Sequence, residues 1–176
     1  MYPYLRMVKE LLTARGAPSL GLLDTYVSRH LCWPWDLDPW MELNNGRTLT
    51  LYDLGRIALG RRTGLDAVLR TNRWGLTVAG SSVRYRRRVT LFDRLEMRTR
   101  CLGWDARFLY MDQSMWKGDD CTSQVLIRSA LVSANGMLPP ADLARAMGHA
   151  AESPALPPWV TGWIAADATR PWPPVR

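Results

Sequence analysis

The stretch of sequence that decides the fold is DLDPWMELNNGRTLTLYDLGRIA, residues 36–58. In its second half, apolar or small residues recur at the helical spacing i, i+3, i+4 and i+7, at Leu51, Leu54, Gly55 and Ala58. Asn44 or Asn45 supplies the side-chain oxygen that commonly caps the start of a helix. The stretch therefore predicts a capped helix that ends near residues 60–64, and its small residues allow a sheet to approach closely.

Strand-like runs lie on both sides of this helix. Residues 21–33 favour a first strand because Thr25, Tyr26 and Val27 suit strands, and the prolines at positions 34 and 39 end it. We expect Ser28 and His30 to lie on its polar face. After the helix, four runs follow at residues 74–89, 94–102, 107–116 and 122–133. The turns at 103–105 and 117–120 are too short for parallel crossovers, so the last three runs must form antiparallel hairpins.

The order of elements is one strand, one long helix and an antiparallel meander of four strands. A sheet of about five strands wrapped around one central helix buries both apolar surfaces, which predicts an α+β fold. The chain is expected to divide into an amphipathic N-terminal helix (1–20), a central domain (21–138) and a C-terminal part (139–176). The last part is expected to hold a short helix at 141–147 and a Pro- and Trp-bearing arm from residue 153.

Composition fits one globular core, because the chain has 176 residues, of which 47% are hydrophobic and 22% charged. No run of about 18 apolar residues is present, and four charges interrupt residues 1–17, so neither a spanning helix nor a signal peptide is expected. These features favour a cytoplasmic location. Cys32, Cys101 and Cys121 lack the spacing of metal ligands, so no metal and no cofactor are expected.

The net charge of +7 raises nucleic acid as a partner, because phosphates attract basic surfaces. Of the 23 basic residues 21 are arginines, and they are spread over most of the chain. Seven of them fall between Arg84 and Arg100, which predicts one local basic patch rather than a nucleic-acid-binding surface. Nucleic acid is therefore not expected as a partner.

The order of elements, together with residues 36–45, resembles the hotdog-fold thioesterases of the 4-hydroxybenzoyl-CoA thioesterase type. The resemblance spans about residues 23–141. It is strongest to the thioesterase superfamily member six group, at the Asp-x-Asp loop, the Asn44-Asn45 pair and the helix residues Asp53 and Arg56, and at residues 102–105. The resemblance implies a hotdog fold and an acyl-CoA thioesterase-like hydrolase.

Thioester hydrolysis needs a carboxylate that activates water or attacks the carbonyl, and donors that hold the oxyanion. The resemblance places the carboxylate on Asp38. The amides of Asn45 and Gly46, in the first turn of the helix, are expected to face the carbonyl oxygen. The alternative is that Asp36 and Asp38 only stabilise a turn, and that the asparagines only start the helix.

The chain departs from its relatives at positions that matter for chemistry. Many relatives carry histidine where this chain has Glu42, and others carry asparagine in place of Trp40 or tyrosine in place of Thr48. Glu42 acts as a second base only if an apolar pocket, such as one formed by tryptophans 33, 35 and 40, raises its basicity. We expect an electrostatic spectator role for Glu42. Asp36, Trp40 and Asn44 are expected to contact the substrate.

Arg84, Arg86 and Arg88 alternate along the strand-like run at 74–89, so we expect them on one face of that strand. The functional interpretation is a cradle for the phosphates of coenzyme A, because the guanidinium group pairs well with phosphate. The structural alternative is a solvated outer face of the sheet.

The first hypothesis is therefore a hydrolase acting on acyl-CoA or another acyl thioester. The second is a non-catalytic acyl- or lipid-binding or scaffold protein with a degenerate hotdog site, for which a peripheral membrane contact through the N-terminal helix or the tryptophan tail is possible but not expected. A homo-oligomer, either a dimer or a dimer of dimers, is expected because such a sheet leaves an edge strand exposed. The acyl class and the thiol carrier stay open.

Overall fold

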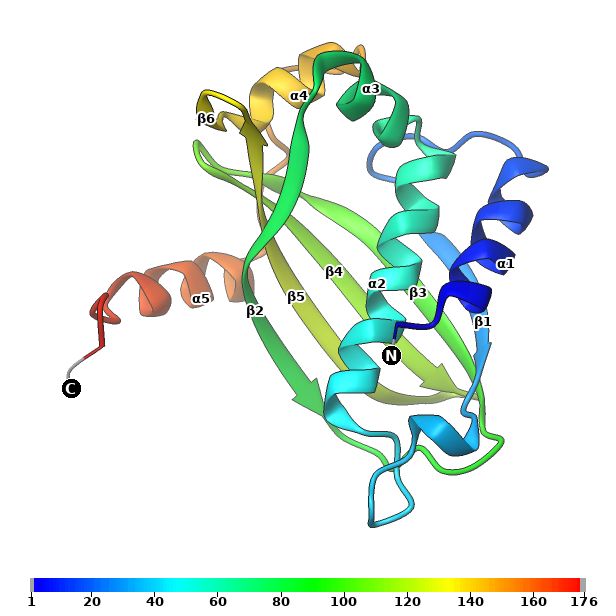
Figure 1. Ribbon diagram of the computed structural model, residues 1–176. Helices are drawn as coiled ribbons and strands as arrows, with labels where there is room; N and C mark the ends of the chain where they lie inside the picture. Colours follow the sequence, from blue (N-terminus) through cyan, green and yellow to red (C-terminus); the bar gives the residue numbers. More distant parts are fainter. Residues whose placement is uncertain (1, 175–176) are drawn as a thin grey trace.

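The computed structural model describes residues 2–174, in which a curled six-stranded antiparallel sheet wraps around one long helix (Figure 1). The strands are β1 (Tyr26–Leu31), β2 (Gly75–Tyr85), β3 (Arg94–Trp104), β4 (Phe108–Lys117), β5 (Asp120–Ser133) and β6 (Gly136–Leu138). The helices are α1 (Tyr4–Arg15), α2 (Asn45–Arg62), α3 (Leu65–Asn72), α4 (Pro140–Ala146) and α5 (Pro158–Ala168), with a short 3-10 turn η1 (Pro34–Asp36). The strand order is β1-β3-β4-β5-β2, and β6 pairs with β5.

Helix α2 is the predicted central helix. Asn44 caps it, because its Oδ1 accepts from the amides of Gly46 and Arg47 at 2.9 and 3.2 Å. The predicted stripe is buried, and at Gly55 a Cβ atom would lie 2.5 Å from Thr99 Oγ1 and 2.7 Å from Met97 Sδ. The close approach of helix and sheet predicted from the small residues is thus confirmed.

The position of β2 differs from the predicted four-strand meander. Strands β3, β4 and β5 are consecutive hairpins as expected, but β2 pairs with β5 at the edge of the sheet opposite β1. Strand β3 already has β1 on one side and β4 on the other, so no place beside it is left for β2. Residues 86–93 carry the chain from β2 across the end of the sheet to β3.

The inward face of β1 also differs from the prediction. Tyr26, Ser28 and His30 are buried, whereas Val27 is 47% exposed. Helix α1 covers these polar groups: the Tyr26 hydroxyl donates to Glu10 Oε2 at 3.0 Å, and Ser28 Oγ lies 2.8 Å from His30 Nε2. Burial lowers the pKa of His30 to about 4. The polar face of the strand can therefore be an interior face, because Glu10 of α1 accepts from Tyr26 while Ser28 and His30 bond to each other.

The C-terminal arm contains helix α5, which lies on the outer face of the sheet (Figure 1). Val160 is fully buried there, and Arg128 of β5 forms an ion pair with Asp167 at 2.9 Å. The Arg128 guanidinium also lies 5.0 Å from the ring centre of Trp163. Helix α3 was not predicted, and it follows Gly64, whose φ of 77° separates it from α2.

Candidate functional site

The loop between β1 and α2 is a tight turn held by Asp38. The Asp38 amide donates to the Glu42 carbonyl at 2.8 Å. The Asp38 Oδ1 atom accepts from the amides of Trp40 and Glu42 at 2.9 and 3.2 Å. Within residues 2–174, Asp38 Oδ2 has no hydrogen-bond partner. The carboxylate is therefore held in a fixed orientation with one free oxygen, while the side chain of Trp40 is largely exposed at 76%.

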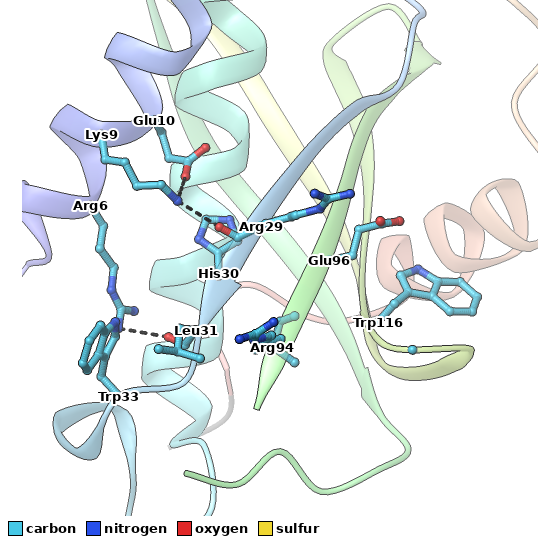
Figure 2. A pocket seen from close by; sticks show the side chains of 12 residues that line it. Arg6, Lys9, Glu10, Arg29, His30, Leu31, Trp33, Arg94, Glu96 and Trp116 are labelled. Atoms are coloured by element: carbon cyan, nitrogen blue, oxygen red, sulfur yellow. Dashed lines mark hydrogen bonds and ion pairs between the residues drawn. The ribbon is translucent and has the colours of Figure 1, made fainter. Parts of the chain in front are cut away.

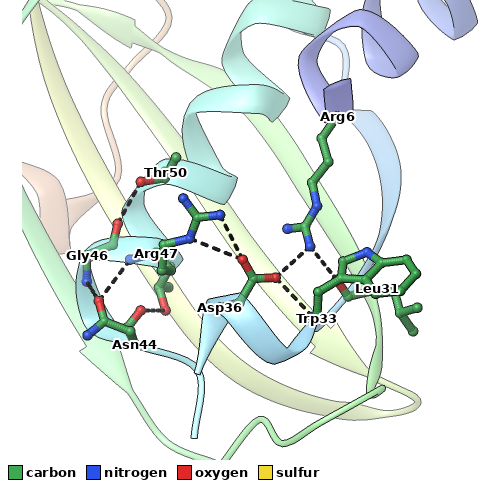
Figure 3. Close-up of polar contacts among 9 residues, drawn as sticks. Arg6, Leu31, Trp33, Asp36, Asn44, Gly46, Arg47 and Thr50 are labelled. Atoms are coloured by element: carbon green, nitrogen blue, oxygen red, sulfur yellow. Dashed lines mark hydrogen bonds and ion pairs between the residues drawn. The ribbon is translucent and has the colours of Figure 1, made fainter. Parts of the chain in front are cut away.

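Asp36 occupies a buried ionic cluster and does not face a cavity (Figure 3). It is fully buried; its Oδ2 accepts from Arg6 Nη2 at 2.6 Å and from the Trp33 amide at 3.0 Å. Its Oδ1 accepts from Nε and Nη2 of Arg47 at 3.1 and 2.9 Å. Asp36 thus joins α1, η1 and the start of α2, and its carboxylate has no surface left for the substrate contact predicted for it.

A cavity of about 250 Å³ lies beside the start of α2. It is lined by Glu42, Leu43, Asn45, Thr48, Tyr85, Arg86, Arg87, Arg88, Val89, Thr122 and Ser123. Of the residues predicted from the sequence, Glu42, Asn45, Arg86 and Arg88 meet here. Asp38, Trp40, Asn44 and Gly46 lie in the adjoining loop and helix start without lining the cavity. The site is therefore only partly the one that the sequence indicated.

The two predicted oxyanion donors have different surroundings. The Gly46 amide donates to Asn44 Oδ1, because the cap residue uses this amide to complete the first turn. The Asn45 amide has no acceptor within the described residues. It lies at the N-terminus of an 18-residue helix, where the aligned peptide dipoles favour negative charge. Asn45 is thus the amide that this structure leaves available in the cavity.

The predicted row of three arginines is divided between two hollows. Strand β2 ends at Tyr85, and the amides of Arg86 and Arg87 both donate to the Thr122 carbonyl, so the alternation stops there. Arg86 and Arg88 line the 250 Å³ cavity. Arg84 lies in a separate hollow of about 430 Å³ together with tryptophans 159 and 163 of α5.

Glu42 is paired with a cation and does not lie in the predicted apolar pocket. Its Oε1 accepts from Arg88 Nη2 at 2.7 Å, and its side chain is 28% exposed. Trp33 and Trp35 stack on each other with ring centres 5.2 Å apart, and neither lines the cavity. The ion pair holds the Glu42 side chain against Arg88.

The sequence did not single out Ser123, which lines the cavity, or Tyr52, which bonds to it from α2. The Tyr52 hydroxyl donates to the Ser123 carbonyl at 2.9 Å, and burial raises the pKa of Tyr52, which keeps the hydroxyl protonated. These residues are 71 positions apart in the chain. The only local signal was that Tyr52 follows Leu51 of the buried stripe.

Another hollow, of about 680 Å³, lies at the β1 edge and contains none of the predicted site residues (Figure 2). On its α1 side, Arg6 Nη2 donates to the Leu31 carbonyl at 3.2 Å and Lys9 Nζ donates to the Arg29 carbonyl at 3.0 Å. Side chains of α1 therefore bond two carbonyls at the β1 edge of the sheet.

Within residues 2–174, no group of three or more histidine, cysteine, aspartate or glutamate side chains is arranged to hold a metal ion. In the same part of the chain, no helix has the length and apolar character needed to cross a bilayer.

The geometry is that of a hotdog fold, and comparison with solved structures supports this class. The probable thioesterase YbaW from Escherichia coli superposes with a TM-score of 0.66, covering 72% of this chain and 98% of that one at 14% identity. A 1,4-dihydroxy-2-naphthoyl-CoA thioesterase from Synechocystis gives a TM-score of 0.61 over 70% of this chain and 95% of that one, at 10% identity. At these identities the likeness shows the fold alone.

Sequence comparison identifies the family. Residues 32–164 match the model of the thioesterase-like superfamily. Protein THEM6 from Xenopus laevis is 32% identical over 164 residues, which cover 92% of this chain and 78% of that protein. Protein THEM6 from Danio rerio is 34% identical over 93 residues, which cover 52% of this chain and 46% of that protein. The chain therefore belongs to the thioesterase-like superfamily, and its resemblance to the member six group is confirmed.

Proposed function

We propose that the chain hydrolyses an acyl thioester, with the acyl carbonyl bound in the cavity at the start of α2. The observation that carries this proposal is the free amide of Asn45, a residue that lines the cavity; in the turn before it, Asp38 keeps one carboxylate oxygen without a partner among the described residues. Membership of the thioesterase-like superfamily supports the same activity. Solved structures of similar fold include proteins described as CoA thioesterases.

In this mechanism Asp38 Oδ2 removes a proton from water, which attacks the thioester carbonyl carbon. The negative charge that develops on the carbonyl oxygen accepts a hydrogen bond from the Asn45 amide at the positive end of α2. When the tetrahedral intermediate collapses, the carbon–sulfur bond breaks, and the leaving sulfur takes the proton from Asp38. The products are the free acid and the thiol. No cofactor takes part in this sequence of steps.

A panel of acyl-CoA esters, read by release of free thiol, tests the activity. Asp38→Asn keeps the size of the side chain and an oxygen that accepts the two loop amides but removes the base, so kcat should fall at least about a hundredfold. Asp24→Asn is the matched control, because Asp24 also fixes a turn, through a 2.8 Å bond from the Gly21 amide, but does not line the cavity. Ligand binding without hydrolysis of any ester would replace this proposal with that of an acyl-binding protein.

The arginines that line the cavity support coenzyme A as the thiol that carries the acyl group. Arg86 and Arg88 line the cavity, and Arg86 forms no ion pair within the described residues. Arg86→Gln should raise KM for a coenzyme A ester and weaken its salt dependence, while hydrolysis of the matching pantetheine ester stays nearly unchanged. Arg84→Gln is the control, because Arg84 lies in the other hollow. Equal losses for both esters would contradict a phosphate contact.

The proposal includes a homodimer that pairs through β2. The two edge strands of the sheet are β1 and β2. Arg6 and Lys9 already bond to backbone carbonyls of β1, whereas the 11-residue β2 presents an open edge. Val78 on β2 and Val27 on β1 are similarly exposed, at 53% and 47%. Val78→Lys should therefore produce monomers and Val27→Lys should not, as measured by light scattering. A wild-type mass near 20.0 kDa would refute the dimer.

A further inference from the structure

Helix α1 turns its polar side toward the body of the protein. Figure 2 shows Arg6, Lys9 and Glu10 projecting from α1 toward β1 and the loop that follows it. Glu10 is only 2% exposed and accepts from Lys9 Nζ at 3.1 Å and from the Tyr26 hydroxyl at 3.0 Å. Arg6 donates to Asp36 in the buried ionic cluster. The polar groups of α1 therefore serve to hold the helix on the domain.

The opposite side of α1 is apolar and open to solvent. Leu5 is 89% exposed, Tyr4 and Leu12 are each 63% exposed, and Val8 is 48% exposed. At about 100° per residue, these four side chains fall within an arc of about 100° on the helix. A surface helix of a globular domain normally turns such a stripe toward the core. In α1, Met7 and Ala14 do pack against the core, but the helix carries this second apolar stripe toward solvent, and nothing within residues 2–174 covers it.

The exposed charged side chains of α1 beside this stripe are all positively charged. The exposed charged side chains of α1 are Lys9, at 59%, and Arg15, which continues the stripe at the end of the helix. The one acidic residue of the helix, Glu10, is buried. An apolar stripe flanked by lysine and arginine, with no exposed carboxylate, complements a surface that is apolar inside and negatively charged outside.

The same charges argue against a second copy of the chain as the partner. A two-fold contact through this stripe would bring Lys9 and Arg15 close to their own copies without an acidic side chain to pair with them. Pairing through β2 also leaves the stripe uncovered, because α1 lies against β1 and β2 forms the opposite edge of the sheet. An anionic surface removes the repulsion that a second copy would create.

We propose that the outward face of α1 docks the protein on an anionic lipid membrane. Leu5, Val8 and Leu12 enter the boundary between headgroups and acyl chains, and Arg15, at the end of the stripe, meets the anionic headgroups. The helix lies in the plane of the surface. This inference does not depend on the proposed hydrolase activity, because none of these residues lines the cavity at α2.

Flotation of the full chain with vesicles tests the inference. The protein should float with vesicles of phosphatidylcholine and phosphatidylglycerol much more than with phosphatidylcholine alone, and added salt should weaken this binding. The double variant Leu5→Glu/Leu12→Glu should lower the bound fraction about tenfold or more. Arg15→Gln should lower binding about fivefold on the anionic vesicles and leave binding to phosphatidylcholine unchanged.

Controls separate the helix from the rest of the surface. Trp172→Ser removes an 88% exposed apolar side chain from the C-terminal tail and should leave vesicle binding unchanged. The thermal unfolding midpoint of each variant checks folding, and Arg15→Gln provides a test that does not alter apolar residues. The inference is overturned if the wild-type protein binds neither vesicle at low salt, or if Trp172→Ser abolishes binding. A change of mass in Leu5→Glu/Leu12→Glu without a change in vesicle binding would also overturn it.

Discussion

Replacing Asp36 with asparagine tests whether the first carboxylate of the Asp-x-Asp loop supports the fold. The side chain is fully buried and accepts from Arg6 at 2.6 Å, from Arg47 at 2.9 Å and from the Trp33 amide at 3.0 Å. Both arginine side chains are also largely buried, with exposures of 14% and 18%. Asp36→Asn removes the negative charge that Arg6 and Arg47 share in this buried cluster, a change that typically costs about 3–5 kcal/mol.

Urea unfolding measures this cost. With a slope of about 2 kcal/mol per molar urea, the midpoint of Asp36→Asn should fall by about 2 M. Asp66→Asn is the matched control, because Asp66 pairs with Arg61 at 2.9 Å while both side chains are about one third exposed. A surface pair of this kind contributes at most about 1 kcal/mol. Equal losses for the two variants, or a stable Asp36→Asn protein that binds the thioester poorly, would refute the structural role of Asp36.

Three further predictions concern the site, the core and the response to pH. Glu42→Gln should lower kcat less than about tenfold in the thiol-release assay, because an ion-paired spectator is removed; a hundredfold loss would make Glu42 a base. Gly55→Ala should destabilise the fold by about 1–3 kcal/mol in urea unfolding, since the new Cβ meets Thr99 Oγ1 at 2.5 Å; a stabilised variant would contradict this close packing. Burial lowers the pKa of His30 from 6.5 to about 4. Because the folded protein holds this histidine neutral, its contribution to the free energy of unfolding is fully present above pH 6.5, and about 3 kcal/mol of that stability is lost as the pH falls toward 4. His30→Gln should flatten this acid limb of the stability profile, whereas replacing the exposed His149 should not.

The central helix and its contact with the sheet were predictable because their signals are local. The cap at Asn44 and the stripe from Leu51 to Ala58 lie within a few turns of one another. The hairpins from β3 to β5 were also predictable, because their short turns permit only antiparallel neighbours. The eight residues 86–93 between β2 and β3 impose no such restriction, so the place of β2 at the far edge could not be derived from turn length.

The candidate site was less predictable because its contacts join distant residues. Asp36 pairs with Arg6 and Arg47, which are 30 and 11 positions away from it in the sequence, and no periodic pattern marks such a cluster. The alternation of the arginines predicted that they share one face of a strand. This prediction holds only within the strand, and β2 ends at Tyr85, before Arg86 and Arg88. Local patterns thus indicated where the loop lies, whereas the packing of α1 and β5 decided what each side chain contacts.

The two edges of the sheet also determine how far the protein can assemble. A sheet with two open edges adds strands at both ends, which is the route to fibres. Here Arg6 and Lys9 already bond the Leu31 and Arg29 carbonyls of β1, so strand addition there must first displace two cations. Within residues 2–174 this leaves β2 as the open edge, and in the proposed dimer two copies would use up each other's open strand. Strand pairing in that dimer would therefore end in a closed assembly of finite size and would not continue into a filament.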